Sequence, residues 1–338
     1  MKAILVEKPN VMRIINTEKP QITNSDDVLV RMTAVGICGS DLHIMHGSHP
    51  YVQYPRIIGH EGAGVVEAVG DGVTSLKVGD PVVVEAVEFC GKCYPCRIGR
   101  TNVCENLRVL GVHHSGTYSE YMRVPERYLV KYDSVLKPEQ AVLAEPYTIG
   151  AQACDRGSVI KDDLVLIHGA GPIGLITCDV ASCRGGRCIV SDVNEKRLEL
   201  AKSFGAKFTV NPLKENIKDL IEQLSNGSGV NVIFDAAGAP GLVEQSLDLA
   251  SQAGRIVPMT FGSKPVPINF GLVNKKELTI SGTRMECGKF PEVVNSLPSR
   301  VDRLNKLVTH IFSIDEFEKA FETAQDPKFG ACKVVMKF

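Results

Sequence analysis

A glycine-rich turn that follows an apolar run most constrains the fold of this 338-residue chain. The run Leu164 to His168 leads directly into Gly169-Ala170-Gly171-Pro172-Ile173-Gly174, after which a helix is expected. Gly169 permits a tight turn, Gly171 lets the backbone approach a pyrophosphate, and Gly174 lets the helix pack closely on the strand. The turn therefore predicts a dinucleotide site at the end of a strand in a parallel sheet.

An acidic residue follows this turn at the distance that dinucleotide sites use. Asp192 ends the next expected strand, about 20 residues after the turn. A carboxylate there accepts hydrogen bonds from the adenosine ribose hydroxyls and repels a 2′-phosphate, so it favours NAD over NADP. Pro172 and Ile173 open the helix that faces the phosphates, and Arg197 is expected near the adenine end of the cofactor. The alternative is a glycine-rich turn in an α/β protein that binds no nucleotide.

Strand-like and helix-like segments alternate from Glu145-Pro146 onwards, which predicts a doubly wound parallel sheet with helices on both faces. Expected helices cover residues 147–156, 172–184, 195–204, 217–224 and 241–251. Expected strands cover residues 164–168, 188–191, 208–210, 230–234, 255–259 and 278–281. The last strand is an expected sheet edge, where unpaired backbone groups invite pairing with a second subunit.

The first part of the chain shows no such alternation. Short β-patterned runs at residues 28–32, 64–69 and 81–84 are separated by turns that contain Gly and Asp, as in a small barrel or open β domain. Beyond residue 285, a helix at 290–297, a polar segment and a β run at 333–337 resemble the first part again. The expected organisation is a β-rich domain of residues 1–148, a nucleotide-binding domain of residues 149–285, and a return to the first domain over residues 286–338.

Four of the eleven cysteines, Cys90, Cys93, Cys96 and Cys104, lie within one short segment. Four thiolates form a closed tetrahedral site for a structural zinc, because no coordination position is left for a substrate. An iron–sulfur cluster also takes four cysteines and is the competing interpretation. Such a cluster needs an electron-transfer role, whereas the glycine-rich turn indicates hydride chemistry. The expected zinc lobe covers residues of about 88–106.

A second group of metal donors lies between residues 36 and 61. Cys38 supplies a thiolate, and His60 and Glu61 supply an imidazole and a carboxylate. The hydroxyl of Ser40 and the imidazole of His43 are close to the thiol in the sequence. Zinc accepts these donor types, and a catalytic zinc keeps one position open for water or substrate. A single pair of Cys and His is more often ordinary core material, but the nucleotide turn and the cysteine cluster in the same chain favour a catalytic zinc.

The composition limits the classes of partner. Hydrophobic residues make up 44% of the chain, and the formal net charge is -1. This balance gives no sign of a polyanion-binding surface, so neither nucleic acid nor an acidic membrane is an expected partner. No apolar run is long enough to span a membrane, and the charged first residues do not resemble a signal peptide. Clustered cysteines are typical of metal ligands in a reducing compartment, so a cytoplasmic location is expected.

These motifs together resemble the zinc-dependent medium-chain alcohol dehydrogenases, and within them the polyol and sugar-acid branch. The resemblance covers essentially the whole chain, through the Cys38 region, Gly59-His60-Glu61, the cysteine lobe, Glu145-Pro146, the glycine-rich turn and Asp192. It implies an α/β protein with a GroES-like, β-rich catalytic domain and a Rossmann domain that binds NAD. It also implies two zinc ions per chain and assembly into a homodimer or homotetramer.

The resemblance implies roles for individual residues of the catalytic metal site. Cys38 and His60 would ligate the zinc, and Glu145 would supply a carboxylate directly or through water. Glu61 would be the alternate or exchanging ligand. The simpler interpretation of Glu145 is a carboxylate that is stabilised by a helix N-terminus.

Other matches concern the proton, the substrate and the cofactor. Ser40 would take the substrate proton, and His43 would pass it on towards solvent. Arg284 falls where the polyol branch often keeps an arginine in the substrate pocket, and Thr260 would lie at the cofactor. The simpler interpretations are a packed side chain for His43 and pairing with a surface acid for Arg284.

The expected activity is reversible oxidation of a secondary hydroxyl in a polyol, sugar phosphate or sugar acid, such as L-galactonate, with hydride transfer to NAD. One alternative is an activity like that of L-threonine 3-dehydrogenase. Others are a quinone reductase-like enzyme without catalytic zinc and a regulatory NAD-binding protein with zinc only in the lobe.

Overall fold

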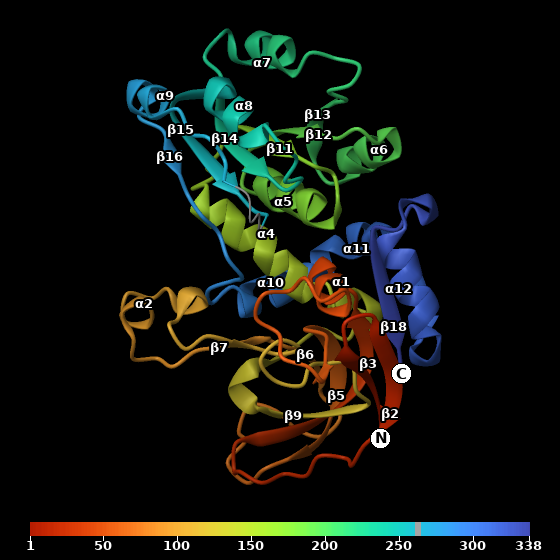
Figure 1. Cartoon of the computed structure of the whole chain (residues 1–338). Helices are drawn as coiled ribbons and strands as arrows, with labels where there is room; N and C mark the ends of the chain where they lie inside the picture. Colours follow the sequence, from red (N-terminus) through yellow and green to blue (C-terminus); the bar gives the residue numbers. More distant parts are fainter. Residues whose placement is uncertain (261–264) are drawn as a thin grey trace. The chain divides into compact units, whose positions relative to one another are not determined.

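The computed structural model describes residues 1–260 and 265–338, and the chain divides into two units (Figure 1). Residues Met1–Glu145 and Cys287–Phe338 form the first unit, and residues Pro146–Glu286 form the second. These boundaries lie near those expected from the sequence. The C-terminal segment thus belongs to the same unit as the N-terminal part of the chain.

The first unit is built around a seven-stranded sheet. Its order is β10-β6-β5-β3-β18-β17, and β9 also pairs with β3. Neighbouring strands are antiparallel except β17 and β18, which are parallel. The strands are β3 (Asp27–Gly36), β5 (Glu61–Val69), β6 (Pro81–Val84), β9 (Tyr121–Pro125), β10 (Leu129–Lys131), β17 (Val308–Ser313) and β18 (Lys333–Lys337). β3 is buried over most of its length, so it forms the centre of this sheet.

Smaller elements complete the first unit. A three-stranded sheet has the order β2-β1-β4, and a separate pair joins β7 to β8. These strands are β1 (Lys2–Lys8), β2 (Val11–Asn16), β4 (Arg56–Ile57), β7 (Val87–Glu88) and β8 (Arg108–Val109). The helices are α1 (Gly39–Met45), α2 (Tyr94–Arg97), α3 (Pro138–Ala141), α10 (Phe290–Ser296), α11 (Val301–Leu307) and α12 (Phe317–Gln325). In Figure 1 the segment that carries β7 and α2 extends away from the sheets of this unit.

The C-terminal return contains more regular structure than the sequence suggested. The stretch interpreted as a polar segment, between the expected helix at 290–297 and the expected strand at 333–337, holds α11, β17 and α12. In α12 the buried residues Phe317, Ala320 and Phe321 recur at helical spacing. This amphipathic pattern in the sequence indicates a helix, and the sequence-based prediction did not use it.

The second unit contains an all-parallel, six-stranded sheet with the order β13-β12-β11-β14-β15-β16. Its strands are β11 (Leu164–His168), β12 (Arg187–Ser191), β13 (Ala206–Val210), β14 (Val230–Asp235), β15 (Ala250–Pro258) and β16 (Thr279–Ile280). Its helices are α4 (Ala144–Arg156), α5 (Pro172–Cys183), α6 (Glu195–Ser203), α7 (Ile217–Ser225), α8 (Leu242–Leu249) and α9 (Phe270–Lys276). The sheet confirms the predicted α/β class. Its order reverses direction beside β11, and sheets of this kind bind nucleotides at the carboxyl ends of the strands at such a point.

Two details of the second unit differ from the sequence-based prediction. The predicted helix at 241–251 is too long, because Ala250 already pairs with Val230 and begins β15. The helix α9 was not anticipated. The predicted edge strand is confirmed, since β16 ends the order of strands that the described residues form.

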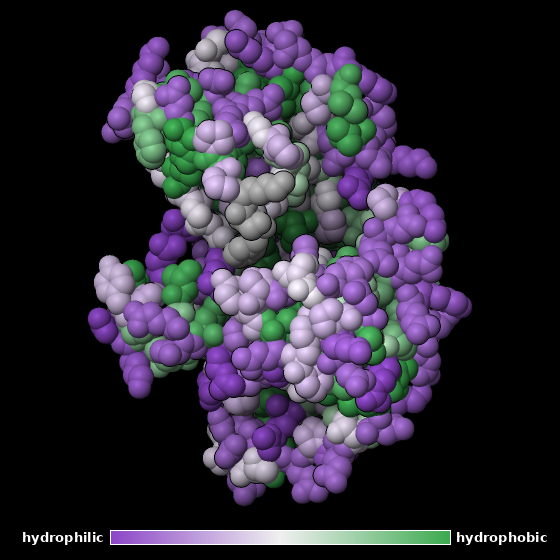
Figure 2. Space-filling model, viewed as in Figure 1, coloured by the Kyte–Doolittle hydropathy of each residue, from purple (hydrophilic) through white to green (hydrophobic). Residues whose placement is uncertain are grey.

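The surface of both units is mainly hydrophilic on the face that Figure 2 shows. Within the ranges that the structure describes, no helix is both long enough and apolar enough to cross a membrane.

Candidate active site and metal centres

Two paired strands of the first unit bring a thiol, an imidazole and a carboxylate together. β3 ends shortly before Cys38, and β5 begins directly after His60. Gly36 is the register partner of Glu61, so the end of one strand lies beside the start of the other. The ligand atoms of Cys38, His60 and Glu61 all lie within 4.8 Å of one another. A side chain at Gly36 would collide with the Glu61 carboxylate, so this position requires glycine.

Asp41 lies behind the imidazole of this group. Its Oδ2 accepts hydrogen bonds from the Cys38 backbone N–H at 2.9 Å and from the Tyr118 hydroxyl at 3.0 Å. Its Oδ1 lies 3.6 Å from His60 Nδ1, while His60 Nε2 lies 3.5 Å from Ser40 Oγ. A carboxylate behind one ring nitrogen, with the other nitrogen turned towards the remaining donors, is typical of metal-binding histidines.

The electrostatics around His60 stabilise positive charge at this point. Burial alone lowers the pKa of His60, but the charges of Asp41 and Cys38 outweigh this effect and raise it well above its usual value. Asp41 Oδ1 and His60 Nδ1 are both buried without a hydrogen-bond partner among the described residues. Zinc on Nε2 would keep a proton on Nδ1 and direct it towards Asp41. Neither Asp41 nor Tyr118 was identified from the sequence, although Asp41 stands where an acidic residue caps a helix.

Glu61 is held by a buried lysine from the C-terminal return. Lys333 Nζ lies 2.6 and 2.8 Å from the two carboxylate oxygens, and both residues are almost fully buried. Burial alone would lower the pKa of Lys333, but the charge of Glu61 outweighs it and raises the pKa above its usual value. Lys333 therefore stays protonated at neutral pH. The pair suits an exchanging ligand, because Glu61 has a cationic partner whenever it is not bound to metal.

Replacement of Lys333 by methionine is expected to lower the free energy of unfolding by roughly 3 to 5 kcal/mol, because Glu61 then stays buried without its partner. Urea unfolding measures the change. The double variant Glu61→Gln/Lys333→Met is expected to recover much of the loss, since it buries no charge. Lys2→Met, which breaks an exposed pair with Asp315, is the control for loss of a lysine. A single variant as stable as this control would contradict the buried pair.

The remaining expected residues of this site lie on two helices. Ser40 and His43 are three residues apart on α1 and therefore share a face of the helix. Ser40 is beside His60, whereas His43 is exposed and its Nδ1 lies 2.9 Å from Ser48 Oγ. Glu145 is buried in the first turn of α4, and among the described residues it lies outside the group of three ligands.

The four cysteines of the lobe converge as a zinc site requires. Cys93 Sγ lies 3.4 Å from Cys96 Sγ and 3.7 Å from Cys104 Sγ, and all four sulfur atoms lie within 4.8 Å of one another. A zinc–sulfur distance of about 2.3 Å in a tetrahedron places sulfur atoms about 3.8 Å apart, so these residues fit zinc. The backbone N–H groups of Lys92 and Cys93 lower the pKa of Cys90 to about 6, which favours a thiolate ligand.

The glycine-rich turn adopts the predicted strand–turn–helix geometry. β11 ends directly before Gly169, and α5 begins at Pro172 with Gly171 as its N-cap. Gly169 has a φ of +96°, which favours glycine. A side chain at Gly174 would collide with the Gly169 carbonyl oxygen, whereas one at Gly171 would meet no atom within 4 Å. The space at Gly171 and the first-turn N–H groups, including that of Ile173, fit a pyrophosphate.

Asp192 lies at the same end of the sheet. Its Oδ2 accepts a hydrogen bond from the Ala170 backbone N–H at 2.7 Å, which fixes the carboxylate beside the glycine-rich turn. Arg197 is half-buried in α6. Thr260 packs against Gly238, where an added Cβ would lie 2.7 Å from the threonine Oγ1. The carboxylate of Asp192 is therefore held beside the glycine-rich turn, directly after β12.

Arg284 is the expected substrate residue. It follows β16 in the second unit and is half-buried. Its guanidinium makes it a candidate for holding an anionic group.

Comparison with known proteins identifies the family. Residues 24–134 match the alcohol dehydrogenase GroES-like domain, and residues 172–299 match the zinc-binding dehydrogenase family. The chain is similar to the starvation-sensing protein RspB of Escherichia coli, with 39% identity over 100% of this chain and 99% of RspB. It is also similar to the L-threonine 3-dehydrogenase of Pyrococcus horikoshii, with 35% identity over 100% of this chain and 99% of that protein.

A solved structure has the same fold. The crystal structure of the alcohol dehydrogenase rspB from E. coli CFT073 in complex with NADH matches with a TM-score of 0.92 and 39% identity. The match covers 100% of this chain and 99% of that chain. These comparisons confirm the predicted combination of a GroES-like domain with a Rossmann-type domain. The chain therefore belongs to the zinc-dependent medium-chain alcohol dehydrogenases, and it is a nicotinamide-dependent dehydrogenase of alcohols or polyols.

Proposed function

We propose that the protein reversibly oxidises a secondary hydroxyl of a polyol, sugar phosphate or sugar acid to a ketone, with NAD as the hydride acceptor. The observation that carries this proposal is the convergence of Cys38, His60 and Glu61 on one point of the first unit. Neither a regulatory NAD-binding protein nor a reductase without catalytic zinc needs that donor group.

The residues around the metal group have separate roles in metal binding and proton transfer. Cys38 and His60 would hold a zinc ion, with Glu145 completing the ligand set directly or through water, and the bound ion would supply the Lewis acidity that lowers the pKa of the substrate hydroxyl. Ser40, next to His60, accepts the proton of that hydroxyl. The exposed His43 then delivers a proton to solvent.

The cofactor preference depends on Asp192. Asp192→Ala is expected to lower the ratio of kcat/KM for NAD over NADP by at least about tenfold, or about 1.4 kcal/mol. The variant loses the acceptor for the ribose hydroxyls and the repulsion of a 2′-phosphate. Steady-state kinetics with both cofactors measure the ratio. Asp192→Asn keeps the shape and removes only the charge, so its ratio should fall between those of the wild type and the alanine variant. An unchanged ratio in Asp192→Ala would exclude Asp192 from the ribose site.

The identity of the substrate is a more specific part of the proposal. Arg284 is proposed to hold a hydroxyl or an anionic group of the substrate. L-Threonine is the second candidate substrate, because the chain is similar to an L-threonine 3-dehydrogenase over its whole length.

A substrate screen tests the function. NADH absorbance is followed with sugar alcohols, sugar phosphates, aldonic acids such as L-galactonate, and L-threonine. We expect turnover with at least one sugar-derived hydroxyl compound and its loss after removal of zinc by a chelator. Turnover of L-threonine alone would favour the second candidate, and turnover that survives removal of zinc would contradict the proposed mechanism.

We also propose an assembly and a location. β16 ends the order of strands in the described part of the sheet, and an exposed edge of this kind favours pairing with a second subunit in a dimer or a pair of dimers. Light scattering distinguishes these assemblies from a monomer. A cytoplasmic location is supported by the eleven free cysteines, which are typical of a reducing compartment.

A further inference from the structure

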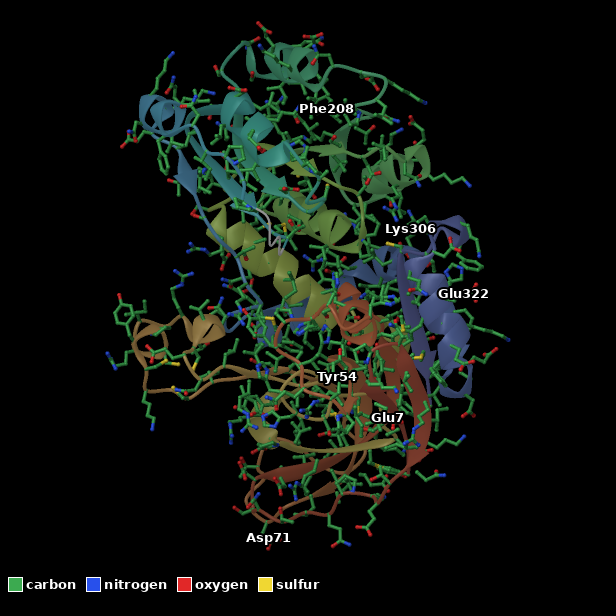
Figure 3. The ribbon with its side chains drawn as sticks, in the orientation of Figure 1. Glu7, Tyr54, Asp71, Phe208, Lys306 and Glu322 are labelled. Carbon is green, nitrogen blue, oxygen red and sulfur yellow. The ribbon has the colours of Figure 1, made fainter. Side chains whose placement is uncertain are left out.

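The first unit contains a second polar site that the mechanism above does not use. It is a pocket of about 190 Å³, lined by Tyr51, Gln53, Arg56, Arg108, Val112 and His113. None of the lining residues is acidic, and two are arginines. The segment that leads into β4 is anchored by Tyr54, labelled in Figure 3, whose hydroxyl donates a hydrogen bond to the Ile44 carbonyl.

Arg56 carries a buried donor that has no protein partner. Its Nε is buried and makes no hydrogen bond within the described residues. Burial lowers the pKa of Arg56, and the charge of Arg108 lowers it further, so the two guanidinium groups are close enough to repel each other. Arg56 as a whole is half-buried and Arg108 is exposed, and two guanidinium groups that approach each other are unfavourable unless an anion compensates for their charge.

Hydrogen bonds orient Arg108 and His113 at the pocket. Arg108 Nη2 donates to His114 Nδ1 at 3.0 Å, and His114 Nε2 donates to Glu88 Oε2 at 3.1 Å. This chain fixes the Arg108 guanidinium through one of its nitrogens. His113 Nδ1 accepts a hydrogen bond from the Val109 backbone N–H at 3.0 Å, so its Nε2 carries the hydrogen. The pocket is therefore rich in N–H donors that suit an oxyanion.

Backbone contacts connect the pocket with the segment that carries His60. Arg56 stands four residues before His60. The segment between them packs on the loop of residues 111–117, which carries His113. Gly59 accepts a hydrogen bond from this loop at 3.0 Å, and a side chain at Gly111 would lie only 2.5 Å from the Gly59 oxygen. Close backbone packing therefore fixes the pocket relative to His60.

His49 packs beside one of the residues that line the pocket. Its ring packs edge-on against Tyr51 with centroids 6.0 Å apart. Burial lowers the pKa of His49, and the nearby imidazoles of His43, His60 and His113 lower it further. The charge of Asp41 opposes this effect.

We propose that the pocket binds the carboxylate or phosphate group of an anionic sugar-derived substrate, while the hydroxyl to be oxidised lies at the group of Cys38, His60 and Glu61. Arg56 and Arg108 bind the oxyanion through paired N–H donors, which lysine cannot reproduce. This inference rests on the proposed function and narrows its substrate class to sugar acids and sugar phosphates.

Calorimetric titration of the zinc-loaded protein, saturated with NAD to occupy the pyrophosphate site, tests the pocket without turnover. The probes are inorganic phosphate, D-gluconate and the neutral sorbitol. We expect saturable binding of at least one of the two anions, weakened at least about tenfold by Arg56→Met and by Arg108→Met. Sorbitol binding should change little. The relative affinity for phosphate and gluconate distinguishes a phosphate site from a carboxylate site.

Three controls make the result interpretable. Arg127→Met removes an arginine of the same unit that pairs with Asp26 outside the pocket, and it should leave anion binding unchanged. Arg56→Lys keeps the charge but lacks the planar fork, so it should recover only part of the affinity. Arg108 is exposed on its strand, so Arg108→Met should fold. This variant tests the pocket even if Arg56→Met fails to fold.

The outcomes separate this inference from the proposed function. Anion binding that both arginine variants weaken supports the pocket even if the substrate screen finds no turnover. Absence of saturable anion binding, or binding that both variants leave unchanged, overturns the pocket even if the enzyme turns over a neutral polyol. Loss of anion selectivity in Arg284→Ala, with no effect of either pocket variant, would assign charge recognition to Arg284 instead.

Discussion

Replacement of Cys38 by serine is expected to lower kcat at least about a thousandfold, while the melting temperature stays close to that of the wild type. The loss corresponds to about 4 kcal/mol, a reasonable share of the stabilisation that a metal Lewis acid provides. The fold should survive, because serine preserves the backbone N–H that donates to Asp41 and the size of the side chain before α1. Neither β3 nor β5 depends on the sulfur atom.

The measurement combines turnover on the best compound of the substrate screen with thermal unfolding and NAD binding. NAD binding is expected to remain, because the glycine-rich turn belongs to the second unit. Cys183→Ser, which makes the same exchange at an exposed thiol outside both metal groups, is the matched control. A drop in melting temperature as large as that of a lobe variant would show that Cys38 is a structural ligand.

Replacement of Cys96 by serine is expected to have the opposite pattern, with a large loss of stability. The lobe contains only short elements such as α2 and the β7–β8 pair, so its order depends on the four sulfur ligands. A loss of roughly 4 kcal/mol, well below the full binding free energy of a structural zinc, would lower the melting temperature by roughly 8 to 16 °C.

Thermal unfolding of the zinc-loaded variant measures this effect. Cys183→Ser removes an exposed thiol outside the lobe and is the matched control. Activity per folded molecule should fall much less than in Cys38→Ser, because the lobe offers no open coordination position. A variant that keeps its melting temperature and loses only turnover would mean that the two metal sites are reversed.

The sequence predicted the elements that local chemistry determines. The glycine-rich turn was predictable because each glycine meets a local steric requirement. Examples are the positive φ of Gly169 and the close contact of Gly174 with the preceding turn. The convergence of the four cysteines was predictable because ligands that are close in the sequence come together without long-range strand pairing. The parallel sheet followed from alternating strands and helices.

Contacts between distant segments could not be predicted from local sequence patterns. Lys333 meets Glu61, which lies 272 residues away in the sequence, only because β18 pairs with β3. Asp41 and Tyr118 are likewise brought together by packing. Arg56 and Arg108 belong to no motif, and they share a pocket because β4 and β8, which belong to different sheets of the first unit, meet there. The residues beside the metal group and in the pocket that sequence reasoning missed are therefore those that only distant segments bring together.

The number of zinc ions per chain tests the central claim most directly. Metal analysis by plasma mass spectrometry on the wild type, Cys38→Ser and Cys96→Ser counts the ions in each purified protein. The account predicts two zinc ions in the wild type and one in each variant, with activity lost in Cys38→Ser and stability lost in Cys96→Ser. A wild-type protein that holds one zinc, keeps it in Cys38→Ser and loses it in Cys96→Ser would contradict a catalytic zinc at Cys38 and His60.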